Sequence, residues 1–305
     1  MKKVKVIVPA TVANLVCGFD ILGMALNDPY DEMELTLRDA PGISIQHTDG
    51  FNLPVVVNEN VAGVALLALL EEYKQPVGFD LVVHKNIMPG SGLGSSAAGS
   101  AGAVVAANHL LGNCFSKEDL VRFAIHGEKL ASGVKHADNI APAIYGGITL
   151  IRSIFPLDII PLGIPQLFVT VVHPQIEVKT SDARQILRKE VQLAAAIKQW
   201  GNIAGLVTGI LKNDMALIGR SLEDVIIEPV RSILIPGFDD VKKKCKEAGA
   251  LGGGISGSGP SVFMLSENEN IAKGVEQVMI EIFEQLGVEF KTYVTTIGEG
   301  VKVVE

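Results

Sequence analysis

Residues 89–98 read Pro89-Gly90-Ser91-Gly92-Leu93-Gly94-Ser95-Ser96-Ala97-Ala98 and decide how the rest of the chain is interpreted. They lie between a predicted strand at 79–84 and a predicted helix at 95–111 that consists mostly of small residues. The glycines let the backbone point its N–H groups inward, and the helix start adds unpaired amides and the positive end of a dipole. The two serine hydroxyls can bond phosphate oxygens or Mg²⁺. The sequence therefore predicts a cradle for the phosphates of a nucleotide.

Two familiar phosphate-binding loops are less compatible with this stretch. The Walker A loop needs Gly-Lys-Ser/Thr, but Gly94 is followed by Ser95. Residues 92–97 match the GxGxxA of dinucleotide-binding folds, yet the acidic residue expected about twenty positions later would have to end a second strand. The stretch 112–119 is typical of a loop and a helix start instead. A glycine turn that packs a strand against a helix, with no ligand, stays open as a structural alternative.

An acidic residue interrupts the apolar side of the next predicted helix. Ser116-Lys117-Glu118-Asp119 resembles a capping box and predicts a helix over 117–130. Its apolar positions at helical spacing are Leu120, Val121, Ala124, Ile125 and Ala131. Glu128 falls among them, and an unpaired carboxylate turned toward a core is costly. A Mg²⁺ ion with nucleotide phosphates would compensate that cost, whereas a buried salt bridge or an early helix end would explain Glu128 without a metal.

Polar residues gather in the segment that follows this helix. His136, Asp138 and Asn139 bring an imidazole, a carboxylate and an amide into four residues, which suits a polar substrate. Turn formation alone would also explain the Asp-Asn pair.

The composition excludes several classes of protein. The chain has 305 residues, with 26 basic against 34 acidic side chains and a net charge of −8, so sequence-independent binding to nucleic acid is not expected. Its 48% hydrophobic content is that of a chain with a real core. Cys17, Cys114 and Cys245 form no CxxC pair, which fits a reducing cytoplasm. Because no run of about 18 apolar residues occurs, we expect a cytoplasmic protein with no membrane partner.

The remaining elements mix strands and helices without a regular βαβ alternation, which favours the α+β class. Pro9 to Asp20 is poor in charge and is predicted as a loop. The prolines at 156–165 predict a connection, and we divide the chain near there into domains 1–160 and 161–305. The second domain is predicted to hold strands at 168–173, 261–265 and 288–297, and helices at 182–199, 202–219, 239–248 and 270–286.

Three segments of the chain resemble the signatures of the GHMP kinases, a family that includes galactokinases and mevalonate kinases. They are Pro9-Ala10-Thr11, the loop from Pro89 to Ala97, and the glycine-rich segment from Gly252 to Pro260. The resemblance extends over nearly the whole chain. It implies a two-domain fold, with an N-terminal half like the second domain of ribosomal protein S5 and a ferredoxin-like C-terminal half. It also implies ATP and Mg²⁺ as the groups that the enzyme uses.

Within this family the chain is most similar to the members that phosphorylate homoserine. Their pattern is matched at 14–23, 136–147, 180–184, 228–231 and 234–238, with Val16-Cys17 as a departure that leaves the polar positions intact. The resemblance implies phosphorylation of the L-homoserine hydroxyl to O-phospho-L-homoserine, in threonine biosynthesis. The substrate-binding residues that it implies are Asn14, Asp20, His136, Asn139, Arg184 and Arg231. Guanidinium forks suit the substrate carboxylate, and Asp20 can pair with its ammonium.

The other site residues are expected from the glycine loop, the carboxylate on the apolar helix side, a helix start at Asn60 and the same resemblance. Those expected at ATP are Met88, Pro89, Gly90, Ser91, Gly92, Leu93, Gly94, Ser95, Ser96, Ala97, Ala98 and, for the adenine, Asn60. Ser96 and Glu128 are expected to bind Mg²⁺. The expected catalytic residues are Asp138, Asn139 and Glu128. Asp138 is the candidate base for the hydroxyl proton, while Asn139 could instead only orient that hydroxyl.

Other functions stay open from the sequence alone. A sibling kinase for mevalonate or a sugar fits the two arginines and Asp20 less well, since a sugar has no carboxylate and mevalonate has no ammonium. A ligand-sensing protein without catalysis would not need Ser96, Glu128 and Asp138. The hypothesis of a nicotinamide-dependent oxidoreductase is supported only by the GxGxxA match. The expected partners are the two small-molecule substrates, and a homodimer is left open.

Overall fold

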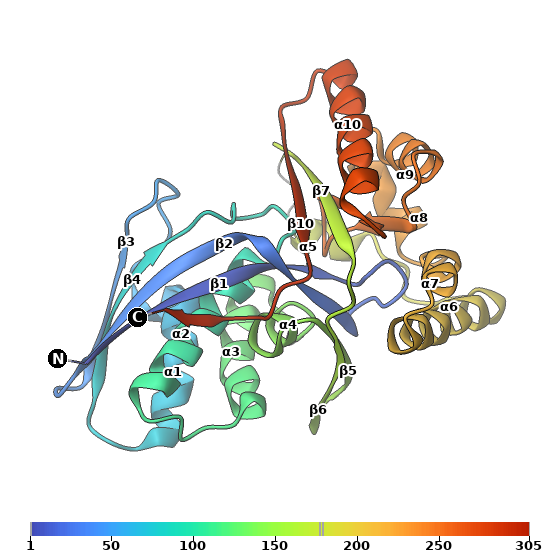
Figure 1. Ribbon diagram of the computed structural model, residues 1–305. Helices are drawn as coiled ribbons and strands as arrows, with labels where there is room; N and C mark the ends of the chain where they lie inside the picture. The colour runs from blue at the N-terminus through green and yellow to red at the C-terminus, as the bar shows by residue number, and fades with distance from the viewer. Residues whose placement is uncertain (1, 177, 179, 305) are drawn as a thin grey trace.

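Two β-sheets form the framework of the protein, whose computed structural model describes residues 2–176, 178 and 180–304 (Figure 1). The first sheet contains β1 (Lys3–Ala13), β2 (Leu22–Arg38), β3 (Gly42–His47), β4 (Gly78–His84), β5 (Ile148–Ile154), β6 (Leu157–Gly163) and β11 (Lys302–Val304). Its strands run in the order β11-β1-β2-β4-β3, with β5 paired to β2 and β6 to β5. β3 and β4 pair in parallel because a helix crosses between them in the chain.

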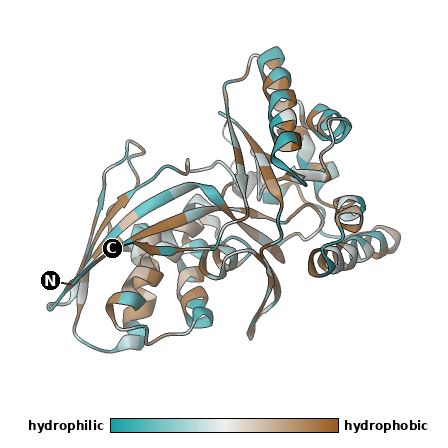
Figure 2. Cartoon of the chain, viewed as in Figure 1, coloured by the Kyte–Doolittle hydropathy of each residue, from teal (hydrophilic) through white to brown (hydrophobic). Residues whose placement is uncertain are grey.

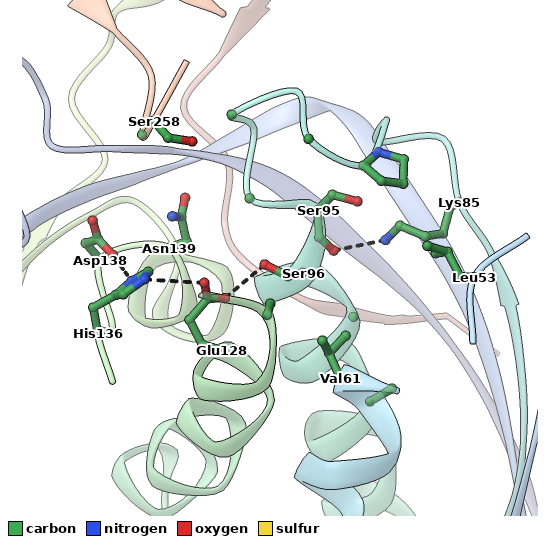
Figure 3. Close-up of a pocket in the computed structure, with 18 of the residues that line it drawn as sticks. Leu53, Val61, Lys85, Ser95, Ser96, Glu128, His136, Asp138, Asn139 and Ser258 are labelled. Atoms are coloured by element: carbon green, nitrogen blue, oxygen red, sulfur yellow. Dashed lines mark hydrogen bonds and ion pairs between the residues drawn. The ribbon is translucent and has the colours of Figure 1, made fainter. Parts of the chain in front are cut away.

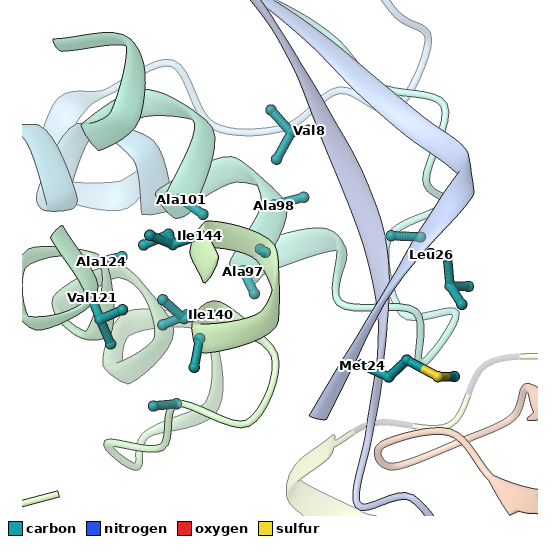
Figure 4. Close-up of a cluster of buried hydrophobic side chains, with 14 of the residues drawn as sticks. Val8, Met24, Leu26, Ala97, Ala98, Ala101, Val121, Ala124, Ile140 and Ile144 are labelled. Atoms are coloured by element: carbon teal, nitrogen blue, oxygen red, sulfur yellow. The ribbon is translucent and has the colours of Figure 1, made fainter. Parts of the chain in front are cut away.

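A layer of helices covers one face of this sheet (Figure 1). It contains α1 (Val61–Tyr73), α2 (Ser95–Leu110), α3 (Lys117–Ser132) and α4 (Ile140–Tyr145). Most residues of α2 are small and buried, so α2 approaches its neighbours closely. A methyl group at Gly102, for example, would lie 2.5 Å from Val8 and 2.7 Å from Met33. Figure 4 shows the resulting core, in which alanines of α2 lie between the first strands and α3 and α4. This packing fixes the start of α2 and the glycine loop before it.

The second sheet has the topology of a ferredoxin-like domain. It contains β7 (Phe168–Pro174), β8 (Gly252–Ile255), β9 (Val262–Ser266) and β10 (Phe290–Thr296), in the antiparallel order β10-β7-β9-β8. With α9 (Phe238–Glu247) before β8 and α10 (Glu269–Leu286) between β9 and β10, the order is βαββαβ. Both helices are amphipathic, and Figure 2 shows hydrophilic and hydrophobic residues alternating along α10. The predicted α+β class is confirmed.

The helices between β7 and α9 differ from the prediction. The structure has α5 (Thr180–Gln185), α6 (Leu193–Lys212), α7 (Met215–Ser221), α8 (Glu228–Arg231) and the short 3₁₀ helix η2 (Ser232–Leu234). The predicted helices at 182–199 and 202–219 are therefore wrong. α6 continues through Gly201, and the chain leaves this helix at Asn213, whose φ of 54° is left-handed. Asp214 then caps the first turn of α7.

Two stretches predicted as loops form strands instead. β1 continues through Pro9 to Ala13, with an irregularity in its pairing to β2 directly after Pro9. β6 occupies most of the proline-rich stretch 156–165. Proline is tolerated in β6 because this strand lies at the edge of the sheet, where it pairs with β5. The predictions of a loop over 9–20 and of a connection over 156–165 are wrong to that extent.

The two sheets meet where β2 lies beside the end of β10. Leu26 forms an isolated bridge with Ile297, directly after β10. The chain then returns to the first sheet as β11, beside β1. The division into domains 1–160 and 161–305 stays a prediction. Across the described residues, no helix combines the length and the apolar character that crossing a membrane requires.

Replacing Ser116 by Ala should destabilise the protein by about 1 kcal/mol. The predicted capping box is present, because Ser116 Oγ accepts from the Asp119 amide at 3.2 Å and Asp119 Oδ2 accepts from the Ser116 amide at 3.1 Å. Urea unfolding measures the change, and Ser116→Thr, which keeps the hydroxyl, is the matched control. An S116A midpoint equal to that of the wild type would show that the box does not stabilise α3.

Candidate active site

A cavity of about 340 Å³ is lined by loops and helix ends from both halves of the chain. Most residues expected at the site line it, namely Asn14, Asp20, Asn60, Pro89, Gly90, Gly92, Gly94, Ser95, Ser96, Glu128, His136, Asp138, Asn139, Arg184 and Arg231. Five expected at ATP are not among its lining residues, namely Met88, Ser91, Leu93, Ala97 and Ala98. Of these, all but Met88 are buried. The side chains of these four buried residues therefore support the loop on the side away from the cavity.

The glycine loop follows the backbone path that its sequence predicts. All three of its glycines have φ between 69° and 80°, a region that other residues resist. At Gly94, a methyl group would also lie 1.9 Å from Thr11 Oγ1, so glycine is needed for space as well. Ser95 and Ser96 begin α2 and line the cavity. The first turn of a helix exposes N–H groups that favour anions, and here that turn lies at the cavity wall.

The second glycine-rich segment supports this loop from the other half of the chain. Ser256 Oγ donates to the Gly92 carbonyl at 2.7 Å, and Ser261 Oγ donates to the Ser91 carbonyl at 2.7 Å. A methyl group at Gly92 would lie 2.6 Å from the Ser256 carbonyl oxygen. This close approach explains why both segments are rich in glycine and serine.

A chain of four polar side chains runs along the cavity, and Figure 3 shows it from Ser96 to Asp138. Ser96 Oγ donates to Glu128 Oε2 at 2.9 Å. His136 Nε2 lies 3.4 Å from Glu128 Oε1, and His136 Nδ1 lies 2.8 Å from Asp138 Oδ1. Glu128 is only 5% exposed, as its place on the apolar side of α3 predicts. The alternative of a buried salt bridge is realised in part, with a histidine as the partner.

Burial and neighbouring charges together set the pKa values of Glu128 and His136 in this row of side chains. Burial raises the pKa of Glu128, against the opposing effects of the His136 charge and the Ser96 hydrogen bond. Burial alone would lower the pKa of His136, but the hydrogen bond to Asp138 and the charges of both carboxylates raise it to about 9. The imidazole is therefore protonated at neutral pH and can donate to both carboxylates.

The oxygen atoms of Ser96, at the start of α2, and of Glu128, on α3, fit a hydrated Mg²⁺ ion. Ser96 and Glu128 place a hydroxyl and a carboxylate 2.9 Å apart beside the glycine loop. Mg²⁺ usually keeps several waters and is bound through one or two carboxylates together with substrate phosphates. Among the residues that the structure describes, no group of three or more His, Cys, Asp or Glu side chains could hold a metal. A metal at Ser96 and Glu128 would therefore need phosphate oxygens and waters as its other ligands.

The opposite end of the cavity is built on a turn after β1. Asn14 and Asp20 have left-handed backbone conformations, with φ of 73° and 62°. Asn14 Nδ2 donates to the Gly257 carbonyl at 2.9 Å, and its Oδ1 accepts from the Asp20 amide at 3.1 Å. Strained conformations of this kind persist where the surrounding structure holds them, and here the turn is held by the second glycine-rich segment.

Asp20 forms a two-point ion pair with Arg184. Arg184 Nη1 donates to Asp20 Oδ2 at 3.1 Å, and Nη2 donates to Oδ1 at 2.9 Å. The sequence assigns the two side chains to opposite charges of one ligand and does not predict their pairing. A zwitterionic ligand would replace this ion pair with two others, one between its positive group and Asp20 and one between its negative group and Arg184.

Arg231 lies deeper than Arg184 and is only 3% exposed. Its Nε donates to the Ala183 carbonyl and its Nη1 to the Gly257 carbonyl, both at 3.0 Å. Burial lowers the pKa of Arg231 to about 10, and the charge of Arg184 acts in the same direction. Both guanidinium groups lie over the ring of Phe19, a cavity residue that the sequence analysis does not select.

The end of the cavity near β4 has a largely apolar wall that includes Leu53, Val61 and Val83. Asn60, expected at the adenine, lies there between the short 3₁₀ helix η1 (Val57–Glu59) and α1. Its Oδ1 accepts from two amides of the first turn of α1, and its Nδ2 donates to the Pro54 carbonyl at 2.6 Å. In this structure the Asn60 side chain therefore shapes the wall.

A lysine lies beside the glycine loop, although the loop itself contains none (Figure 3). Lys85 Nζ forms a buried ion pair with Asp31 and donates to the Ser95 carbonyl at 3.0 Å. Sequence reasoning missed this pair. The available signal was that Asp31 alternates with Met33 and Leu35 on the buried side of β2, which is the same kind of clue that singles out the carboxylate on α3.

Comparisons with known proteins agree with this geometry. Residues 60–147 match the family model "GHMP kinases N terminal domain", and residues 206–285 match "GHMP kinases C terminal". A homoserine kinase of Chloroherpeton thalassium is 46% identical over 299 residues, covering 94% of each chain. The crystal structure of a homoserine kinase from Cytophaga hutchinsonii is 47% identical, with a TM-score of 0.95 over 100% of this chain and 98% of that one. An L. major mevalonate kinase structure, at 16% identity, shares the fold with a TM-score of 0.71 over 95% of each chain.

The fold and the cavity together define a two-domain small-molecule kinase that uses ATP. This chain belongs to the GHMP kinase family, in the branch of the homoserine kinases. The family and the fold predicted from the sequence are confirmed.

Proposed function

We propose that this protein transfers the γ-phosphoryl group of ATP to the hydroxyl of L-homoserine, giving O-phospho-L-homoserine in threonine biosynthesis. The observation that carries the proposal is a single cavity lined by a phosphate loop, a carboxylate–histidine chain and the Asp20–Arg184 pair. Relatives named homoserine kinase, at 46% and 47% identity over nearly the whole chain, support the same assignment.

The phosphate end of the cavity works through backbone groups and local charge. The glycine loop and the first turn of α2 bind the phosphates of ATP, and Lys85, which is paired with Asp31, holds the Ser95 carbonyl at the start of that helix. Ser96 and Glu128 hold Mg²⁺. The bound ion would neutralise charge that develops on the phosphoryl oxygens during transfer.

The other end recognises a zwitterionic amino acid. The substrate ammonium pairs with Asp20, and the carboxylate takes the guanidinium groups of Arg184 and Arg231. The hydroxyl lies toward Asp138 and Asn139. Because Asn139 Oδ1 already accepts from Thr11 Oγ1 at 2.8 Å, the Asn139 amide is oriented with its NH₂ group left to donate.

Positioning and charge neutralisation supply most of the rate, since loose phosphoryl transfer needs little covalent help. Asp138 is the candidate to accept the hydroxyl proton. Its Oδ1 accepts from protonated His136, which fixes the orientation of the carboxylate.

A substrate panel tests the assignment. The purified protein is incubated with ATP, Mg²⁺ and either L-homoserine, mevalonate, galactose or shikimate, and ADP release is followed. We expect homoserine to exceed the others by about 100-fold or more in kcat/KM, because a substrate that lacks either charge cannot replace the Asp20–Arg184 ion pair with two pairs of its own. Preferential turnover of mevalonate or a sugar would contradict the proposal, and no ADP release with any alcohol would favour a ligand-sensing protein.

Replacing Asp138 by Asn should lower kcat about tenfold, because a loose transition state depends little on a base. Asparagine keeps an oxygen that can accept from His136, so the hydrogen-bonded chain stays intact. Steady-state kinetics with homoserine and ATP varied in turn measure the effect, and Asp239→Asn, on the exposed side of α9, is the control. A loss of about 1,000-fold or more would make Asp138 an essential general base.

We also place this reaction in the cytoplasm, which the free state of Cys17, Cys114 and Cys245 supports. The two small-molecule substrates are the expected partners. A homodimer stays open, and sedimentation velocity of the purified protein tests it.

A further inference from the structure

We infer that Phe19 is a positioning residue for recognition of the acceptor carboxylate, because its ring holds the guanidinium groups of Arg184 and Arg231 together at one end of the cavity. The inference rests on the proposed function and names the residue that makes this end specific for an amino acid.

The ring of Phe19 is in contact distance of both positive charges. The guanidinium carbon of Arg231 lies over the ring at 5.0 Å from its centroid, and that of Arg184 lies over it at 5.6 Å. A cation within about 6 Å of an aromatic centroid is attracted by the negative face of the ring. Phe19, Arg184 and Arg231 all line the same cavity. Two cations therefore share one aromatic ring at the place where a carboxylate is expected.

Both arginines need such a contact. Arg231 is buried, and its charged form is disfavoured by that burial and by the neighbouring charge of Arg184. Arg184 Nε is buried, and no hydrogen-bond partner for it is found among the described residues. Asp20 contacts only the two terminal nitrogens of Arg184. The ring supplies part of the missing compensation.

An aromatic ring suits this task better than a second acid would. A carboxylate would neutralise the guanidinium groups and accept from their N–H donors, which would compete with the substrate. The face of a ring attracts the cations and leaves those donors to the substrate. When the substrate ammonium takes Asp20, Arg184 would still keep its contact with Phe19.

The backbone around Phe19 is held in place from several directions. Asn14 and Asp20 have left-handed conformations at the two ends of the turn. Between them, the Cys17 carbonyl accepts from Gln199 Nε2 of α6 at 2.8 Å, and the Gly18 amide donates to the Asn14 carbonyl at 2.8 Å. The position of the ring is therefore set by the turn itself and by α6.

The test compares two alcohols that differ by the carboxylate alone, L-homoserine and 3-amino-1-propanol. The measured quantity is the ratio of their kcat/KM values with ATP and Mg²⁺. Phe19→Leu keeps an apolar side chain but removes the aromatic face, and we expect the ratio to fall about tenfold. Phe19→Tyr keeps the face and should keep most of the ratio. A general loss of packing would lower both kcat/KM values and leave their ratio unchanged.

Two results would overturn the inference. One is a Phe19→Leu ratio equal to that of the wild type, and the other is an equal fall in Phe19→Leu and Phe19→Tyr, which would mean that the aromatic face has no special role. Thermal unfolding checks that each variant is folded, and Phe19→Met replaces Phe19→Leu if the latter is not. Phe155→Leu is the control. The ring of Phe155 is exposed and has Lys135 Nζ at 5.3 Å from its centroid, but it is not among the cavity residues. A wild-type protein that phosphorylates neither alcohol would refute the proposed function itself.

Discussion

Replacing Glu128 by Gln should lower kcat by about 100-fold or more, a loss typical of removing one preorganised electrostatic group. Glutamine has the same shape and can still accept from Ser96, but it carries no charge to attract Mg²⁺. Because burial raises the pKa of Glu128, the charged form is disfavoured in the folded protein. The variant should therefore be at least as stable as the wild type. Turnover at saturating ATP and homoserine over a Mg²⁺ titration, together with thermal unfolding, measures both effects.

Glu118→Gln is the matched control for this change, since Glu118 lies on the same helix but is exposed near its start. It should leave turnover and the Mg²⁺ dependence as they are. A Glu128→Gln enzyme with near-normal turnover and an unchanged Mg²⁺ requirement would exclude Glu128 from metal binding. The carboxylate would then act only as a partner for His136.

The path of the glycine loop could be predicted because its main causes are local. Glycines with positive φ and serines at a helix start act within a few residues, so residues 89–98 indicate most of their own path, and contacts with Thr11 and Ser256 complete it. Glu128 could be selected because helical periodicity alone places it on the buried side of α3. In each case the main signal lies within one short stretch of the sequence.

At the other end, the residues that line the cavity could be selected, but the ion pair between them could not be predicted because it joins distant parts of the sequence. Asp20 and Arg184 are 164 positions apart, and nothing near either one indicates that they pair. The predicted helix boundary near Gly201 is wrong for a related reason. A glycine costs a helix about 1 kcal/mol, which is less than the gain from burying Leu206 and Ile210 further along α6. The low helix propensity of glycine is therefore outweighed by tertiary packing of α6, which cannot be inferred from the local sequence.

Replacing Gly94 by Ala should lower kcat/KM for ATP about 100-fold, because displacing a binding group by about 1 Å can cost that much. Gly94 has a φ of 69°, and the added methyl group would lie 1.9 Å from Thr11 Oγ1 and 3.0 Å from Asn139 Oδ1. Either the loop moves or the hydrogen bond from Thr11 to Asn139 breaks. Both responses disturb the place where the proposed function brings the phosphates and the acceptor hydroxyl together. Kinetics with varied ATP and binding of ADP by calorimetry measure the loss.

Gly112→Ala separates backbone strain from this clash. Gly112 has a φ of 84°, its added methyl group would meet nothing within 4 Å, and it follows the end of α2 opposite the glycine loop. We expect it to lose about 1 kcal/mol of stability, the cost of a left-handed side chain, with ATP kinetics unchanged. If Gly94→Ala behaves in the same way, with lower stability but normal ADP binding, the path of the loop at Gly94 has no part in holding the phosphates. Phosphate binding would then depend on other groups of the cavity, and the start of α2 would serve packing alone.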